Sequence, residues 1–191
     1  FAILANSEDG LMFVLVNKNS EGLEIKQTSS LDQTRTMCEI NMKDIFISDD
    51  EIMIGSDSCI NTWEKVKNIS LGYLAMEQVG GAQACLDMST QYAKERIQFG
   101  RPIGSFQAIQ HICANMLVQL ESAKSVAYSA VRTDTSDDLE VEMSAMLAKS
   151  YCSEVFNKIA GDNIQVHGGI GFTWEPVSYT HLTLPTSGGV G

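Results

Sequence analysis

The stretch KERIQFGRPIGSFQAIQH, residues 94–111, decides how this chain is interpreted. It joins two segments with helical periodicity through a Gly-Arg-Pro-Ile-Gly break, in which Gly100 is expected to end the first helix and Pro102 to prevent its continuation. Three cations surround the break: Lys94, Arg96 and Arg101. A basic cluster at a helix junction is suited to an anionic group. A cationic helix end stabilised only by the helix dipole would give the same pattern.

The composition limits the possible functions. The chain has 191 residues, 44% of them apolar, which is enough for a packed core in one domain or two small ones. Thirteen basic and 24 acidic residues give a net charge of -11, which argues against nucleic acid or an anionic membrane as partner. No apolar run approaches the ~20 residues that span a bilayer. The chain opens without Met on a strand-like run, so we expect a fragment of a longer protein.

The cysteines indicate a reducing compartment. They are odd in number, widely scattered and without a Cys-x-x-Cys pair, which argues against a disulfide framework and against a zinc site. We expect most of them to be small core residues. They are Cys38, Cys59, Cys85, Cys113 and Cys152.

The first part of the chain has the pattern of strands. Residues 11–16 are almost continuously apolar, which predicts a strand buried on both faces, and residues 23–28 alternate as a half-buried strand would. Asp9-Gly10 is a turn signal between the first two strands. Further strands are expected at 1–5, 37–42 and 44–47.

Helical periodicity begins near Ile60. One helix is expected to run to Ile97, a second to begin after a Ser105 cap, and a third to run from near Ser136 to Gly168. Their apolar residues include Tyr73, Leu74 and Val79 in the first, Met116, Leu117 and Leu120 in the second, and Met143, Met146, Leu147, Phe156 and Ile159 in the third. Long helices with short connections pack as an antiparallel bundle.

The predicted fold is therefore α+β, a partial antiparallel β-domain followed by an antiparallel helical bundle. We expect the β-domain at 1–57 and an incomplete bundle at 58–175. Residues 176–191 contain two prolines and a glycine-rich end without a helical stripe. We expect this last segment to be an artefactual or disordered tail.

Two motifs resemble one family. Residues 94–111 resemble the helix-turn-helix signature of the acyl-CoA dehydrogenases, and QVHGGIGF at 165–172 resembles the second signature of that family. Residues 31–35 and 40–47 resemble the later half of its middle β-domain, whose main flavin-ring contacts would precede Phe1. The resemblance implies an FAD enzyme that introduces a Cα–Cβ double bond into an acyl-CoA thioester and passes electrons to a separate acceptor. It also implies a homo-oligomer, a dimer or tetramer, or a mixed assembly.

The resemblance implies roles for individual residues. Arg96 would bind the FAD pyrophosphate, because its guanidinium fork matches phosphate oxygens. Phe99 would pack against the flavin nucleotide, Gln107 would hydrogen-bond to it, and Phe106 is either a nucleotide contact or a core residue. The glycine-rich loop would contact the adenosine and pyrophosphate across a subunit interface, through Gln165, Gly168 and Gly169. No role is assigned to His167, and His111 is expected on the surface.

The catalytic base is not identified. Family members place it, usually as Glu, either at the position of Ser70 or beyond the glycine-rich loop, where this chain has only residues 176–191. Glu77 is a further carboxylate, for which a solvated position is favoured over a base in an apolar pocket. Gly80-Gly81 indicates a close helix crossing or, alternatively, the lining of an acyl pocket.

Three alternatives to a dehydrogenase remain open. They are a non-catalytic assembly subunit of the same fold, a flavin monooxygenase or nitroalkane-oxidase-like relative, and a helical interaction module. The resemblance implies a cytoplasmic protein in a bacterium or a mitochondrial matrix protein in a eukaryote.

Overall fold

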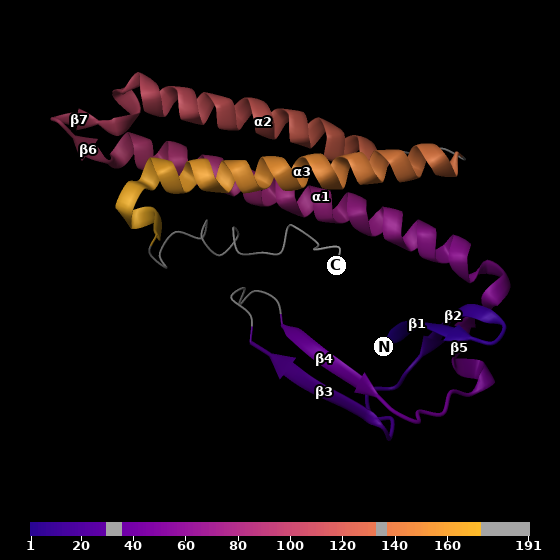
Figure 1. The fold of residues 1–191 in the computed structure, drawn as a ribbon. Helices are drawn as coiled ribbons and strands as arrows, with labels where there is room; N and C mark the ends of the chain where they lie inside the picture. Colours follow the sequence, from indigo (N-terminus) through magenta and orange to yellow (C-terminus); the bar gives the residue numbers. More distant parts are fainter. Residues whose placement is uncertain (30–35, 133–136, 173–191) are drawn as a thin grey trace. The chain divides into compact units, whose positions relative to one another are not determined.

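Short strands in the first part of the chain are followed by three long helices, so the fold is α+β as predicted (Figure 1). The structure is a computed structural model and describes residues 1–29, 36–132 and 137–172. The chain forms two compact units, Phe1–Lys67 and a second that begins at Asn68. The predicted tail 176–191 lies outside the described residues, as does the 31–35 part of the resemblance to the middle β-domain.

The first unit contains a three-stranded antiparallel sheet in the order β1-β2-β5. β1 (Ala2–Ser7) and β2 (Gly10–Leu15) form a hairpin from Ala2↔Leu15 to Ser7↔Gly10, which places the turn where Asp9-Gly10 predicts it. β5 (Ile52–Ile54) was not predicted, because three residues are too few to show a strand period. Trp63 of the first helix packs against Phe13 of β2, with ring centroids 6.4 Å apart.

A second antiparallel pair joins β3 (Leu23–Thr28) to β4 (Met37–Met42), in register from Leu23↔Met42 to Thr28↔Met37. The prediction of a strand at 44–47 is wrong, because Asp44 has a positive φ of 55° that breaks the extended chain. A 3-10 turn, η1 (Asp49–Glu51), follows. The burial predictions are also wrong: β3 is exposed apart from a half-buried Leu23, and only Val14 is buried within β2.

The three helices are confirmed, with corrections at their ends. α1 (Ser56–Glu95) is followed by a small hairpin of β6 (Ile97–Gln98) and β7 (Arg101–Pro102), then by the 3-10 turn η2 (Ile103–Ser105). Gly100 therefore lies in a hairpin turn and does not cap α1. α2 (Gln107–Arg132) begins two residues after Ser105, whose hydroxyl donates to the Pro102 carbonyl at 2.8 Å instead of capping the helix.

α3 (Asp138–His167) has the ends that the sequence predicts. The Asp137 side chain accepts a hydrogen bond from Leu139 N at 3.0 Å, which makes it the N-cap. Gly168 is the C-cap, with φ of 64° and its N–H bonded to the Ile164 carbonyl. The 3-10 turn η3 (Gly168–Phe172) continues directly from it.

The core of the second unit lies between the three helices and is rich in small residues. α2 buries Met116 and Leu120 one turn apart, and small side chains from all three helices let the backbones approach closely. These small residues include Ala75, Ala82 and Cys85 of α1, Ala123 and Ala127 of α2, and Ala148, Cys152 and Ala160 of α3.

Several apolar residues that the periodicity assigned to helix stripes are exposed. Tyr73, Leu74, Leu117, Met143, Met146 and Leu147 all lie on the surface of the chain, whereas Val79, Phe156 and Ile159 are buried as expected. A helix stripe is predicted from large apolar side chains. In α1 and α3, however, many of the core positions are filled by alanine, serine or cysteine.

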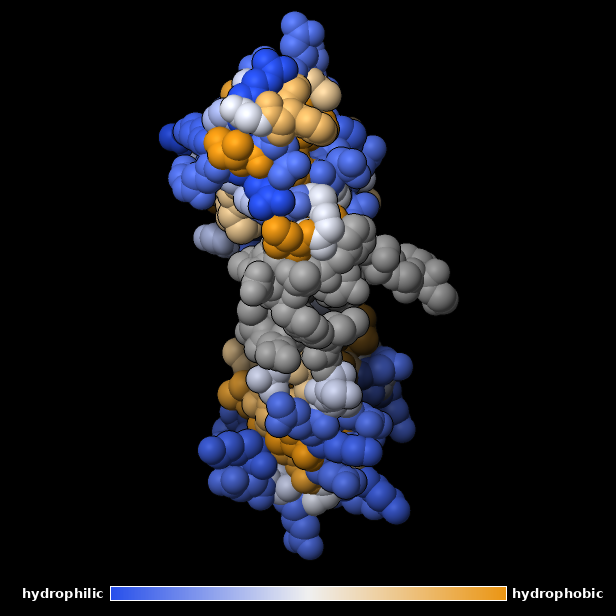
Figure 2. Space-filling view, turned by 90° about the vertical axis from the view of Figure 1, so that its left-hand side faces the viewer, coloured by the Kyte–Doolittle hydropathy of each residue, from blue (hydrophilic) through white to orange (hydrophobic). Residues whose placement is uncertain are grey.

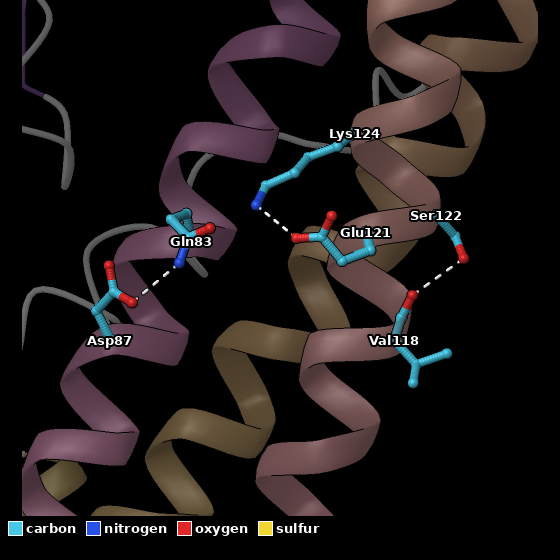
Figure 3. A network of polar contacts seen from close by, with 6 residues as sticks. All are labelled: Gln83, Asp87, Val118, Glu121, Ser122 and Lys124. Carbon is cyan, nitrogen blue, oxygen red and sulfur yellow. Dashed lines mark hydrogen bonds and ion pairs between the residues drawn. The ribbon is translucent and has the colours of Figure 1, made fainter.

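Polar side chains on α1 and α2 pair within their own helices (Figure 3). Gln83 donates to Asp87 at 2.9 Å, and Lys124 lies 2.7 Å from Glu121. Such exposed pairs one turn apart contribute only about 0.3–0.5 kcal/mol each, so they add little to the stability of the helices. Among the described helices, none is both long enough and apolar enough to cross a membrane. Within the same ranges, no three His, Cys, Asp or Glu side chains could jointly hold a metal ion.

Candidate functional site

A cavity of about 560 Å³ lies at the end of the helical unit that carries the β6–β7 hairpin and η3. Its walls come from the last turn of α1, the hairpin, the start of α2 and the end of α3. The lining residues are Tyr92, Arg96, Gln98, Phe99, Ile103, Phe106, Ile109, Val166, His167, Gly169 and Ile170. Figure 2 faces this end of the unit and shows hydrophobic residues exposed among hydrophilic ones.

The β6–β7 hairpin holds Arg96 and Phe99 at the cavity. Ile97 pairs with Pro102 and Gln98 with Arg101, which leaves Phe99 and Gly100 as a two-residue turn with φ of 55° and 77°. Two positive φ values are typical of the type I′ turn that matches strand twist. The base of the hairpin is closed because Ile103 N donates to the Arg96 carbonyl at 2.8 Å.

Aromatic contacts distinguish the two arginines of the motif. Phe99 is 91% exposed, and its ring meets Phe106 nearly edge-on, with centroids 6.1 Å apart. The Arg101 guanidinium lies 4.2 Å from the centroid of Phe106, in a cation–π contact that holds it against the ring. Arg96 is exposed and lines the cavity, so it is the guanidinium available there to an anion.

The glycine-rich turn forms another wall of the cavity. A Cβ at position 171 would lie 2.7 Å from the Ile164 carbonyl oxygen, so only glycine lets η3 fold back this closely onto α3. Gly169 lines the cavity, and a Cβ there would meet nothing within 4 Å. The backbone at Gly169 is therefore open to a ligand.

The structure brings together part of the predicted set. Arg96, Phe99, Phe106 and Gly169 line one cavity, although Arg96 and Gly169 are far apart in sequence. Gln107, Gln165 and Gly168 do not line it and are exposed on neighbouring positions. The cofactor roles of all seven residues stay predictions.

Tyr92 and His167 are among the lining residues to which the sequence assigned no role. The rings of Tyr92 and His167 stack with centroids 4.4 Å apart, and His167 Nδ1 lies 2.8 Å from the Asn163 carbonyl oxygen. Both residues lie in the last turn of a helix. The sequence pattern of a helix does not distinguish an aromatic ring that lines a cavity from any other half-buried residue. Only the position of His167 inside the glycine motif pointed here.

Ser70, Glu77 and the glycine pair lie outside this cavity. Ser70 and Glu77 are exposed on α1. Gly81 faces the Phe156 ring of α3, with 2.8 Å between an added Cβ and two ring atoms, whereas Gly80 would meet nothing within 4 Å. The close helix crossing is therefore found at Gly81 alone.

A buried polar pair connects α1 to α3 near the cavity. Ser89 Oγ donates to Asn163 Oδ1 at 2.6 Å, and both side chains are fully buried. Burial also raises the pKa of the nearby Cys85 thiol to about 11, against a smaller lowering effect of its hydrogen bond with Asn163. Because Asn163 also binds His167 through its carbonyl, it links the core of the unit to the cavity wall.

The family model described as the acyl-CoA dehydrogenase C-terminal domain matches residues 71–183, more than half of the chain. The chain belongs to the acyl-CoA dehydrogenase family. The match includes both motifs and extends into residues 176–183, part of the segment expected to be a tail.

Individual members of the acyl-CoA dehydrogenase family are similar to this chain. It is 43% identical to acyl-CoA dehydrogenase FadE34 of Mycobacterium tuberculosis over 129 residues, which cover 67% of this chain and 18% of that protein. It is 43% identical to acyl-CoA dehydrogenase IpdE2 of Mycolicibacterium smegmatis over 102 residues, which cover 53% of this chain and 31% of that protein. The chain therefore spans less than a third of either relative.

The fold of the acyl-CoA dehydrogenases is shared by both units. The structure of butyryl-CoA dehydrogenase from Megasphaera elsdenii superposes with a TM-score of 0.84 at 20% identity. The superposition covers 95% of this chain and 49% of that protein. At this identity the likeness shows the fold alone.

Proposed function

We propose that this chain supplies part of the FAD site of an acyl-CoA dehydrogenase, which oxidises an acyl-CoA thioester at Cα–Cβ. The observation that carries the proposal is that Arg96, at the base of the hairpin, and Gly169, in the glycine-rich turn, line the same cavity. A cavity lined by a guanidinium and an open backbone turn is suited to a diphosphate, since the guanidinium supplies charge and the glycine permits close approach.

The residues present fit the FAD nucleotide. Arg96 would hold its pyrophosphate, and the exposed Phe99 ring would pack against its planar groups. Arg101 is held on Phe106, so it steadies the hairpin while Arg96 binds. A positive φ at Phe99 costs about 1–3 kcal/mol. The pairing of the hairpin strands offsets this cost and holds Phe99 in place before the ligand binds.

The bound flavin would supply hydride acceptance, and this chain would supply binding and orientation. A base must also remove the acyl α-proton, and we assign none here. Ser70 stands at one position where the resemblance expects that base, and residues 176–191 stand at the other. We propose that the intact protein is an oligomer in which this chain completes a neighbour's FAD site. Its electrons would pass to a separate acceptor, in the cytoplasm or the mitochondrial matrix.

The test is the affinity of the purified chain for FAD, measured by equilibrium dialysis with flavin absorbance as the readout. Arg96→Gln should weaken binding about tenfold or more, because a charge-assisted phosphate contact is lost. The matched control is Lys94→Gln, which removes an exposed cation that does not line the cavity. Equal affinity for FAD in the wild type and Arg96→Gln would overturn the proposal.

A non-catalytic assembly subunit is the second candidate, favoured by Ser70 in place of a carboxylate. The two functions separate when acyl-CoA is added to the FAD-loaded protein without oxygen. Bleaching of the flavin would identify a dehydrogenase. Retained colour with bound FAD would identify the assembly subunit. In a separate aerobic assay, oxygen uptake driven by NADH would identify a monooxygenase-like relative.

A further inference from the structure

We propose that His167 is a second cationic ligand in this cavity and binds the same diphosphate as Arg96 when its ring is protonated. The inference rests on the proposed function, because it assigns an additional residue to the same ligand. It arises from the position of the ring and not from the glycine motif, in which no role was assigned to this residue.

The contacts of His167 determine which ring nitrogen a ligand can reach. Nδ1 lies 2.8 Å from the Asn163 carbonyl oxygen, which only accepts hydrogen bonds, so Nδ1 carries a hydrogen. One face of the His167 ring is covered by the Tyr92 ring, with ring centroids 4.4 Å apart. No described residue bonds to Nε2, and the ring lines the cavity. In the neutral ring Nε2 therefore accepts, and in the protonated ring it donates with a positive charge.

The end of α3 makes a second cation useful. Helix C-termini carry partial negative charge, which repels a phosphate and favours a cationic side chain. His167 is the last residue of α3 and directly precedes the glycine turn. Its Nδ1 donates a hydrogen bond to the Asn163 carbonyl, and Gly168 N donates one to the Ile164 carbonyl. A protonated ring thus offsets the unfavourable helix end just where the proposed diphosphate passes Gly169.

The proposal predicts that the affinity for the diphosphate depends on pH. The titratable or charged side chains that line the cavity with His167 are Arg96 and Tyr92. Histidine is the side chain type whose charge ordinarily changes between pH 6 and pH 8. The pyrophosphate of FAD is a diester that stays ionised throughout. Binding should therefore be tightest at low pH and should weaken as the ring loses its proton.

The experiment measures the affinity of the full chain for FAD at pH 6 and pH 8. We expect wild type to bind about tenfold more tightly at pH 6, and His167→Gln to bind equally at both values. His111→Gln is the matched control, because His111 is exposed on α2 outside the cavity, and it should keep the wild-type pH dependence. His167→Asn, which can still donate to the Asn163 carbonyl, should behave as His167→Gln.

A spectroscopic measurement makes the test independent of affinity. Nitrogen-15 spectra of the histidine rings should show the Nδ1–H tautomer for the signal lost in His167→Asn, and FAD should shift the Nε2 resonance of that ring. This inference would be overturned if His167→Gln kept the wild-type pH dependence of FAD affinity. If Arg96→Gln still bound FAD more weakly in that case, the proposed function would remain intact. Failure of the wild type to bind FAD at either pH would overturn both.

Discussion

Two adjacent glycines in α1 meet different surroundings. A Cβ added at Gly81 would lie 2.8 Å from two atoms of the buried Phe156 ring, whereas one at Gly80 would meet nothing within 4 Å. Alanine favours a helix over glycine by about 1 kcal/mol. At Gly81 this gain is opposed by overpacking, which costs about 1–3 kcal/mol.

We therefore predict opposite effects of the two alanine variants on stability. Gly80→Ala should raise the free energy of unfolding by about 0.5–1 kcal/mol, and Gly81→Ala should lower it by about 1 kcal/mol. Urea denaturation followed by circular dichroism measures both, and each variant is the control for the other. A stabilised Gly81→Ala would contradict the close packing of α1 on α3.

Two buried thiols have strongly altered acidity. Burial raises the pKa of Cys85 and that of Cys152 to about 11, from an ordinary value of 9.0. Alkylation requires the thiolate, so a raised pKa and burial both slow it. Because the folded-state pKa lies above the unfolded one, these thiols favour the folded state below about pH 9 and lose that contribution as pH rises toward 11.

Alkylation by iodoacetamide at pH 8 should consequently follow exposure. Cys38, which is exposed on β4, should react first, and Cys85 and Cys152 should react only when the protein is unfolded in urea. Mass spectrometry of peptides at successive times gives the order. Equal rates for Cys38 and Cys85 in the native protein would show that the helical core is open.

At the scale of elements, the position of the cavity depends on how the helices end. Asp137 caps α3 through Leu139 N at 3.0 Å and, more weakly, Glu140 N at 3.4 Å. The opposite end is set by Gly168 and by η3 folding back over Ile164. The β6–β7 hairpin turns the chain from α1 into α2 and carries Arg96 at its base.

The N-cap of α3 can be tested separately from the cavity. Asp137→Ala should lower the free energy of unfolding by about 1 kcal/mol, because it leaves backbone N–H groups without an acceptor. Asp137→Asn keeps an oxygen acceptor and should cost only a few tenths of a kcal/mol. Thermal unfolding measures both. Since the cap lies at the far end of α3 from the cavity, FAD affinity should not change, and a parallel loss would contradict separate roles.

At the scale of the whole molecule, exposed apolar residues form a stripe on α3. Leu139, Met143, Met146 and Leu147 recur at intervals of four, three and one, and each is at least 55% exposed. Large apolar stripes usually mark a contact surface. The net charge of -11 opposes association between copies, and salt screens that repulsion.

Self-association should therefore increase with both protein concentration and salt. Met143→Glu should shift the sedimentation coefficient toward that of the monomer. Met53→Glu introduces the same charge at an exposed methionine of the first unit and should leave association unchanged. Association that weakens with salt, or that Met53→Glu disrupts equally, would show that the α3 stripe is not the contact surface.

The sequence alone determined the fold class, the three helices and the ends of α3, because capping residues and glycines act locally. Through two motifs it also predicted seven cofactor residues, of which Arg96, Phe99, Phe106 and Gly169 line the cavity. It assigned Met143 and Leu147 to a helix stripe, although alanines and cysteines fill much of the core, because periodicity weights large side chains over small ones.

Only the tertiary structure decided which residues share one cavity. The β6–β7 hairpin depends on positive φ at Phe99, which local propensity disfavours and pairing between strands imposes. Tyr92 and His167 meet because α1 and α3 end at the same side of the bundle, and no spacing within either helix shows that contact. Contacts between distant segments depend on how the helices pack, and the sequence pattern of a single helix does not contain this information.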